Sequence, residues 1–216
     1  MDRAVDILKG KIENGLRIRI VGDYDIDGIC STYLLYQGLG RCGAKADYQI
    51  PERIRDGYGI NESIIQRAYD DGIDTIITCD NGIAAMDQIR MAKDMGMTVI
   101  ITDHHEVPFD ENGNELPPPA DAVVNPKQSA CFYPFKGIFG GVVAYKLVQA
   151  LYEAFKVPAG DWEGMLEFAA IATVGDVMRL QDENRILVRQ GLKKISETKS
   201  LGLKKLVEAC GLDIRE

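Results

Sequence analysis

Apolar and polar positions in the first 125 residues alternate between two patterns. Short β-branched apolar runs, typical of buried strands, are separated by longer segments whose apolar residues recur every three or four positions, as in helices. The runs predict strands over residues 16–21, 45–50, 73–79, 97–102 and 122–124. The segments between the first four runs predict helices over 29–39, from the N-cap Asn61 to about 69, and over 84–95. Residues 106–120, which contain three consecutive prolines, predict a loop.

The remainder of the chain has only the helical pattern. It predicts helices over residues 140–155, 162–173, 183–195 and 201–209. Strands that alternate with single helices are typical of α/β proteins with a parallel sheet and right-handed crossovers. We therefore predict one domain over 1–216, with a Rossmann-like, mostly parallel sheet of about five strands flanked by helices. The sheet portion spans about 16–125, and a helical portion packed on it spans about 138–216.

Composition is compatible with a single globular domain of ordinary kind. The chain has 216 residues, of which 46% are hydrophobic and 27% charged. Its five cysteines are scattered without a C-x-x-C pair, which argues against a disulfide framework or a zinc ribbon and favours a reducing cytoplasm. The first residues do not resemble a signal peptide, and no apolar stretch reaches the roughly 20 residues of a membrane span. These features predict a cytoplasmic protein without a membrane partner.

The formal net charge of −8 argues against a broad basic surface for nucleic acid. Two bound divalent ions would reduce this charge to about −4. A polyanionic substrate is therefore expected to be recognised at a metal centre rather than by wide electrostatic capture.

Acidic side chains and the only two histidines follow the predicted strands. They are Asp23, Asp25 and Asp27 after the first strand, Asp80 after the third, Asp103, His104 and His105 after the fourth, and Asp176 behind a later apolar segment. In an open α/β sheet, ligands bind beyond the carboxyl ends of the strands. These side chains are therefore expected to meet at one edge of the sheet.

Each acid also has an ordinary structural explanation. Asp80 could cap a helix, Asp27-Gly28 could form a turn, and Asp176 could be a surface acid. The three alternating aspartates could begin a calcium loop, but a strand precedes them and the required glutamate is missing. Capping needs one acid per helix, however, and a cluster of carboxylates is costly unless cations offset the repulsion. Carboxylates with imidazole suit Mn²⁺ or Mg²⁺, and the ligands suffice for two ions.

Four segments resemble, in order, the four motifs of the DHH phosphoesterase superfamily. They are DYDIDG at 23–28, CDNG at 79–82, DHH at 103–105 and GDVM at 175–178. The segments at 53–59, 124–127, 133–135 and 183–185 are similar to the RecJ-type branch, so the likeness extends from about residue 17 over nearly the whole chain. The resemblance implies a two-metal phosphodiesterase that degrades single-stranded DNA from its 5′ end, with Mn²⁺ preferred and Mg²⁺ as the second choice.

The resemblance also implies roles for individual residues. Asp25 and Asp27 would bind one ion each, Asp80 would bridge both, His104 and Asp176 would complete the ligands of the second ion, and Asp23 would assist the first ion. His105 would face the scissile phosphate as charge stabiliser or proton donor, Asp103 would orient His104, and Asn81 with the amides of Gly82 and Ile83 would help hold a phosphate. Arg53 and Arg55 are either phosphate contacts or solvated surface charges, and Tyr58 either stacks on a base or packs in the core.

The chain departs from the RecJ-type pattern in two ways. The C-terminal domain with a glycine- and histidine-rich motif has no counterpart here, and Gly175 and Arg179 stand where alanine and proline are more frequent. We expect either the catalytic domain of a longer protein or a minimal form, with weak activity in the absence of that domain. Two alternatives stay open: a hydrolase of short oligoribonucleotides, cyclic dinucleotides or pyrophosphate, and a degenerate module that only binds a partner. The oligomeric state is not predicted.

Overall fold

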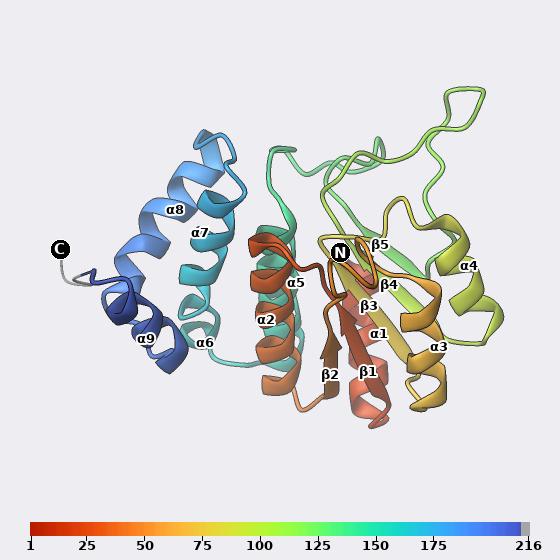
Figure 1. Cartoon of the computed structure of the whole chain (residues 1–216), viewed down its shortest axis with the longest axis horizontal. Helices are drawn as coiled ribbons and strands as arrows, with labels where there is room; N and C mark the ends of the chain where they lie inside the picture. The colour runs from red at the N-terminus through yellow and green to blue at the C-terminus, as the bar shows by residue number, and fades with distance from the viewer. Residues whose placement is uncertain (213–216) are drawn as a thin grey trace.

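A five-stranded, all-parallel sheet forms the centre of the computed structural model, which describes residues 1–212 (Figure 1). The strands are β1 (Arg17–Val21), β2 (Lys45–Gln49), β3 (Thr75–Cys79), β4 (Thr98–Thr102) and β5 (Ala122–Val124). They are arranged in the order β2-β1-β3-β4-β5. The α/β class and the five parallel strands predicted from the sequence are confirmed.

The strand order reverses beside β1. The chain leaves β1 towards β2 on one side and later returns to β3 on the other, so the carboxyl ends of β1 and β3 are neighbours. Such a switch point leaves a crevice where the two following loops diverge, and ligands of open α/β sheets bind there. The loops after β1 and β3 begin at Gly22 and Asp80, and they contain the first two acidic motifs.

Helices cover both faces of the sheet (Figure 1). On one face pack α1 (Asp2–Glu13), α2 (Ile26–Arg41) and α5 (Gly140–Phe155), and on the other α3 (Glu62–Asp70) and α4 (Met86–Asp94). All five residues of β3 are buried, because this central strand is covered on both sides. That double cover explains its unbroken apolar and β-branched sequence.

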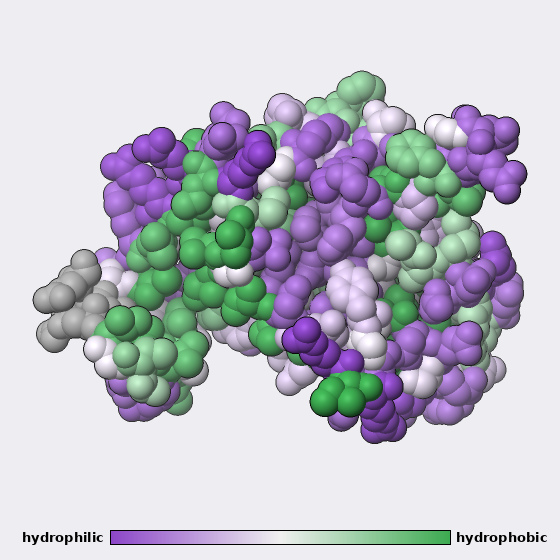
Figure 2. Space-filling view, turned by 45° about the horizontal axis from the view of Figure 1, so that its top comes forward, coloured by the Kyte–Doolittle hydropathy of each residue, from purple (hydrophilic) through white to green (hydrophobic). Residues whose placement is uncertain are grey.

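The remaining helices form a portion that lies beside α2 and α5, away from the sheet (Figure 1). They are α6 (Ala159–Glu163), α7 (Leu166–Gly175), α8 (Asp182–Ile195) and α9 (Leu201–Ala209). Of the helical portion predicted to pack on the sheet, α5 contacts the strands, whereas α7 contacts α2 and α5 instead. Figure 2 shows apolar side chains on part of the surface of this portion. Leu201 and Leu206 of α9 are exposed. The end of the predicted helical portion, residues 213–216, lies outside the described range.

Several boundaries differ from the sequence prediction. The helix α1 was not predicted, although Ala4, Leu8 and Ile12 form a buried stripe at helical spacing. The helix α2 begins at Ile26 rather than at 29, because Asp25 caps it. The helix predicted over 162–173 is divided into α6 and α7. Among the helices of residues 1–212, none combines the length and the apolar character that a bilayer crossing requires.

Candidate metal centre

The loop after β1 contributes three aspartates with different surroundings. Asp25 is exposed, and its Oδ1 accepts a 2.8 Å hydrogen bond from the amide of Gly28 as the N-cap of α2. Asp23 is fully buried, and its Oδ1 accepts a 3.1 Å bond from the amide of Gly59, whereas Oδ2 has no partner. Burial raises the pKa of the Asp23 carboxyl. The loop therefore holds one solvated and one desolvated carboxylate ahead of Asp27.

Asp27 is buried in the first turn of α2 and is held by the N-terminus of α5. Its Oδ2 accepts a 2.9 Å bond from the amide of Gly140, and its Oδ1 a 2.6 Å bond from the amide of Gly141. A helix N-terminus favours a negative charge through its free amides and its dipole. A Cβ atom on Gly140 would lie 2.8 Å from Cβ of Asp80, so only glycine permits this approach. Sequence reasoning missed this contribution, although the glycine pair at the start of a predicted helix was a visible signal.

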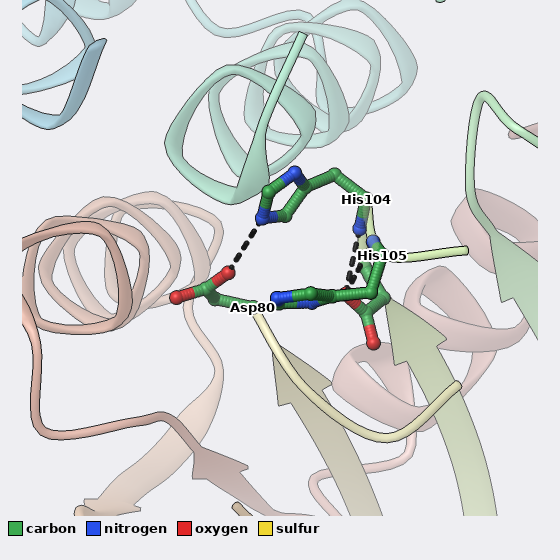
Figure 3. A group of neighbouring side chains, drawn as sticks. Asp80, His104 and His105 are labelled. Carbon is green, nitrogen blue, oxygen red and sulfur yellow. Dashed lines mark hydrogen bonds and ion pairs between the residues drawn. The ribbon is translucent and has the colours of Figure 1, made fainter. Parts of the chain in front are cut away.

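Asp80 and His104 face each other across the ends of β3 and β4 (Figure 3). The Nε2 atom of His104 lies 3.0 Å from Oδ1 of Asp80 and 3.6 Å from Oδ2 of Asp27. Asp80 and His104 are only 2% and 8% exposed. The imidazole therefore joins carboxylates from two different loops within a desolvated cluster.

The electrostatics of this cluster reflect crowded negative charge. Burial, followed by the neighbouring charge of Asp80, raises the pKa of Asp27 to about 8. Burial, followed by the charge of Asp25, raises the pKa of Asp80 to about 8. Burial lowers the pKa of His104 and so favours the neutral imidazole, which is the form that ligates metal ions. The arrangement is one that added cations would stabilise.

Asp176 joins the cluster from the helical portion, where it follows α7. Ligand atoms of Asp27, His104 and Asp176 lie within 4.8 Å of one another, and the same holds for the group Asp80, Asp103, His104 and His105. Two buried polar atoms here, Oδ2 of Asp23 and Nδ1 of His104, have no partner, and Oδ1 of Asp80 has only its ion-pair contact with Nε2 of His104. Buried polar atoms are normally satisfied, so the two unpartnered atoms call for a ligand. The oxygen and imidazole donors fit Mn²⁺ or Mg²⁺.

The carboxylate of Asp103 is fixed by its own loop. Its Oδ1 accepts from Nδ1 of His105 at 2.8 Å and from the amides of His104 at 2.7 Å and His105 at 3.1 Å. Its Oδ2 accepts from the amide of Ile83 at 2.9 Å. The predicted orientation of the His104 ring by Asp103 is therefore wrong: the aspartate bonds the ring of His105 and reaches His104 only at its main chain. This hydrogen bond raises the pKa of His105.

Comparisons with known proteins agree with this geometry. The family model described as "DHH family, N-terminal domain" matches residues 17–173. The chain belongs to the DHH family. It is 42% identical over 216 residues to the single-stranded-DNA-specific exonuclease RecJ of Bacillus subtilis, and 34% identical over 227 residues to that of Escherichia coli. Each alignment includes 100% of this chain but only 26% and 38% of the respective relative.

Solved structures of DHH proteins superpose on nearly the whole chain. A structure described as exonuclease RecJ bound to manganese matches with a TM-score of 0.85 and 33% identity, over 98% of this chain and 52% of that one. RecJ of Thermus thermophilus in complex with Mn²⁺ matches with a TM-score of 0.79 and 32% identity, over 98% and 29% of the two chains. The chain thus spans about half or less of the proteins that it resembles.

The asparagine of the second DHH-family motif, Asn81, has a structural role. Asn81 is 1% exposed; its Oδ1 accepts from the amide of Ile60, and its Nδ2 donates to the carbonyl groups of Val21 and Cys79. These contacts leave the side chain no free group for a phosphate, which contradicts the predicted role. The amide of Ile83 is likewise engaged by Asp103, and α4 begins only at Met86, so no helix N-terminus stands here. The phosphate contact of the Gly82 amide stays a prediction.

The loop between β2 and α3 contains the remaining predicted residues, of which Arg53 and Tyr58 contact segments of this DHH site. Arg53 and Arg55 are exposed, and the guanidinium of Arg53 lies 5.4 Å from the ring centroid of Tyr24 in the first motif. Their phosphate contacts stay predictions. Tyr58 is 52% exposed and is not a core residue. Its hydroxyl donates a 2.7 Å hydrogen bond to the main-chain oxygen of Asp80.

Proposed function

We propose that this chain is a two-metal phosphodiesterase domain that hydrolyses single-stranded DNA from the 5′ end and releases 5′ mononucleotides. The observation that carries the proposal is the cluster of the buried Asp27, Asp80 and His104 with the half-buried Asp176, including the unpartnered Nδ1 of His104, at the switch point of the sheet. Relatives described as single-stranded-DNA-specific exonucleases support the substrate. RecJ structures with Mn²⁺ or Mg²⁺ support the metal, and Mn²⁺ is our first choice.

The carboxylates and His104 would hold the ions. Asp25 and Asp27 would each help to hold one ion, Asp80 would be shared by both, His104 and Asp176 would complete the ligands of the second ion, and Asp23 would assist at the first. Divalent ions, when bound in such a site, polarise the phosphoryl oxygens and lower the pKa of water. The amides of the α5 N-terminus keep the Asp27 carboxylate in place throughout.

His105 supplies the acid chemistry of the proposed reaction. Its hydrogen bond to Asp103 favours the imidazolium, because the carboxylate stabilises the positive charge. An imidazolium beside the scissile phosphate offsets developing negative charge and donates a proton to the leaving oxygen. Asp103 acts through His105 and is itself fixed by three backbone amides. Its immobility gives the ring a defined orientation.

The surface charge is consistent with recognition at the centre rather than over a wide face. At a net charge of −8 the chain repels DNA at long range, and two bound divalent ions would reduce the net charge only to about −4, with the positive charge concentrated at the site. Arg53 and Arg55 are the proposed phosphate contacts on the nearby loop. We propose residues 1–216 as the catalytic domain of the activity; the cytoplasmic location stays a prediction.

A nuclease assay with single-stranded DNA tests the proposal. The full chain is incubated with Mn²⁺ and a 5′-labelled strand, beside Asp80→Ala and the control Asp87→Ala, whose exposed side chain pairs only with Arg90 among the described contacts. We expect labelled mononucleotide from the wild type and the control, and none from Asp80→Ala. Equal turnover in Asp80→Ala would overturn the metal-centred mechanism. A ladder of shortened labelled strands would show digestion from the 3′ end and overturn the polarity.

A substrate panel tests whether the same metal chemistry acts on single-stranded DNA or on other phosphoesters. Short oligoribonucleotides, cyclic dinucleotides and pyrophosphate are offered to the same proteins under the same conditions. Hydrolysis of one of these, with single-stranded DNA left intact, would contradict the proposed substrate. Failure of the wild type to bind Mn²⁺ and to turn over any substrate would favour a module that only binds a partner.

A further inference from the structure

The main chain of Asp80 adopts an unusual conformation at the centre of the site. Its φ of 61° lies in the left-handed region, which a residue with a side chain rarely occupies. Such a conformation persists only where the surroundings hold it. Here it turns the carboxylate away from the strand direction of β3 and towards His104, with Oδ1 3.0 Å from Nε2. The contacts that hold this turn therefore also orient the carboxylate of Asp80, the proposed metal ligand.

Two hydrogen bonds hold the main chain of Asp80. Its amide donates to the carbonyl of Thr102 at 3.1 Å, which ties it to β4. Its carbonyl accepts from the hydroxyl of Tyr58 at 2.7 Å. The first bond continues the ladder of the sheet, whereas the second comes from a side chain in another loop. Among the described contacts, Tyr58 thus supplies the one side-chain hydrogen bond to the main chain of Asp80 itself.

The same tyrosine also contacts His105. Its hydroxyl lies 3.5 Å from both ring nitrogens of His105, and the two rings meet edge to face with centroids 6.0 Å apart. Gly59 fixes the approach: it has a φ of 66°, donates its amide to Asp23, and would place a Cβ only 3.0 Å from Cβ of Asn81. The loop therefore brings Tyr58 between the proposed bridging ligand and the proposed proton donor.

We propose that Tyr58 is a positioning residue that aligns Asp80 through its hydroxyl and His105 through its ring. The proposal rests on the function proposed above for Asp80 and His105. Tyr58 itself ligates no ion and gives no proton. Loss of the hydroxyl should weaken Mn²⁺ binding by about threefold to tenfold, the range expected for one neutral hydrogen bond. It should also lower kcat while leaving KM unchanged, because the substrate contacts remain.

The test compares Tyr58→Phe with Tyr48→Phe in the full chain. Tyr48 lies on β2 and is 56% exposed, and Tyr48→Phe removes the same hydroxyl, so this substitution is the matched control. Mn²⁺ affinity is measured by titration calorimetry, kcat and KM on single-stranded DNA, and stability by thermal unfolding. We expect reduced Mn²⁺ affinity and kcat in Tyr58→Phe alone. Tyr58→Ala, which also removes the ring from His105, should lower kcat further.

The outcomes separate this proposal from the proposed function. Wild-type Mn²⁺ affinity and kcat in Tyr58→Phe would overturn the positioning role. A lowered melting temperature alongside these unchanged values would show that the hydroxyl contributes only to stability, and would overturn it equally. A raised KM with unchanged kcat and affinity would make Tyr58 a substrate contact and equally overturn it. A wild type that binds Mn²⁺ but leaves DNA intact would refute the nuclease, while the affinity comparison would still decide the role of Tyr58.

Discussion

Replacing Gly140 by alanine should damage the metal centre without touching a ligand. The added methyl would lie 2.8 Å from Cβ of Asp80 and 2.9 Å from Oδ2 of Asp27, well inside the 3.5–4.0 Å or so of ordinary contact. The start of α5 or both carboxylates must therefore shift. Overpacking of this kind costs about 1–3 kcal/mol. The higher helix propensity of alanine relative to glycine offsets about 0.5–1 kcal/mol of this cost. We expect a net loss of about 0–2.5 kcal/mol in the free energy of unfolding.

The larger effect should fall on metal affinity. The displaced amide of Gly140 no longer supports Asp27, and loss of a partner that orients a ligand lowers affinity by about 10–100-fold. Titration calorimetry with Mn²⁺ measures this change, and urea unfolding of the metal-free chain measures stability. Gly40→Ala in α2 is the control, because a Cβ there meets nothing within 4 Å. Wild-type Mn²⁺ affinity in Gly140→Ala would show that the Gly140 amide does not support the metal ligands, and an equal loss in Gly40→Ala would show that the effect is not specific to this glycine.

Two further predictions concern the candidate metal centre, and a third concerns an ion pair away from it. His104→Ala should lose Mn²⁺ affinity more than about tenfold, whereas His105→Ala should keep affinity and lose turnover; calorimetry and nuclease assays showing the reverse order would contradict the assigned roles. Asp27 and Asp80, whose pKa values rise from 3.8 unfolded to about 8 folded, bind more protons in the folded chain, so metal-free stability should fall as pH rises from about 4 to 8. The Mn²⁺-induced rise in melting temperature should accordingly be larger at pH 8 than at pH 6, and an equal rise would count against these shifts. Arg19→Ala removes a largely buried guanidinium that pairs with two aspartates. It should lower the free energy of unfolding in urea by about 1–3 kcal/mol and leave Mn²⁺ affinity unchanged.

The sheet and the ligand cluster could be predicted because local patterns encode them. The central strand β3 is covered on both faces, so its residues are apolar or β-branched throughout, and the predicted strand over 73–79 contains Thr75–Cys79. Parallel strands point their carboxyl ends to one edge, so residues that directly follow them had to converge there. Asp27, Asp80 and His104 do so in the structure.

The contacts around these residues could not be predicted, because they depend on tertiary packing. The carboxylate of Asp103 can bond either neighbouring ring, and only the path of its loop directs it to His105. Asn81 looked available as a polar loop residue, but the close approach of the β1 and β3 ends uses all of its side-chain hydrogen-bonding groups. The helix α5 begins 113 residues after Asp27, so no local pattern indicated that its amides cap this carboxylate.

Anomalous scattering from Mn²⁺-soaked crystals tests the two-metal centre most directly. We expect two peaks about 3.5–4 Å apart. They should lie among the carboxylates and imidazole of Asp25, Asp27, Asp80, His104 and Asp176. A single peak, or two peaks away from these side chains, would contradict the two-metal centre.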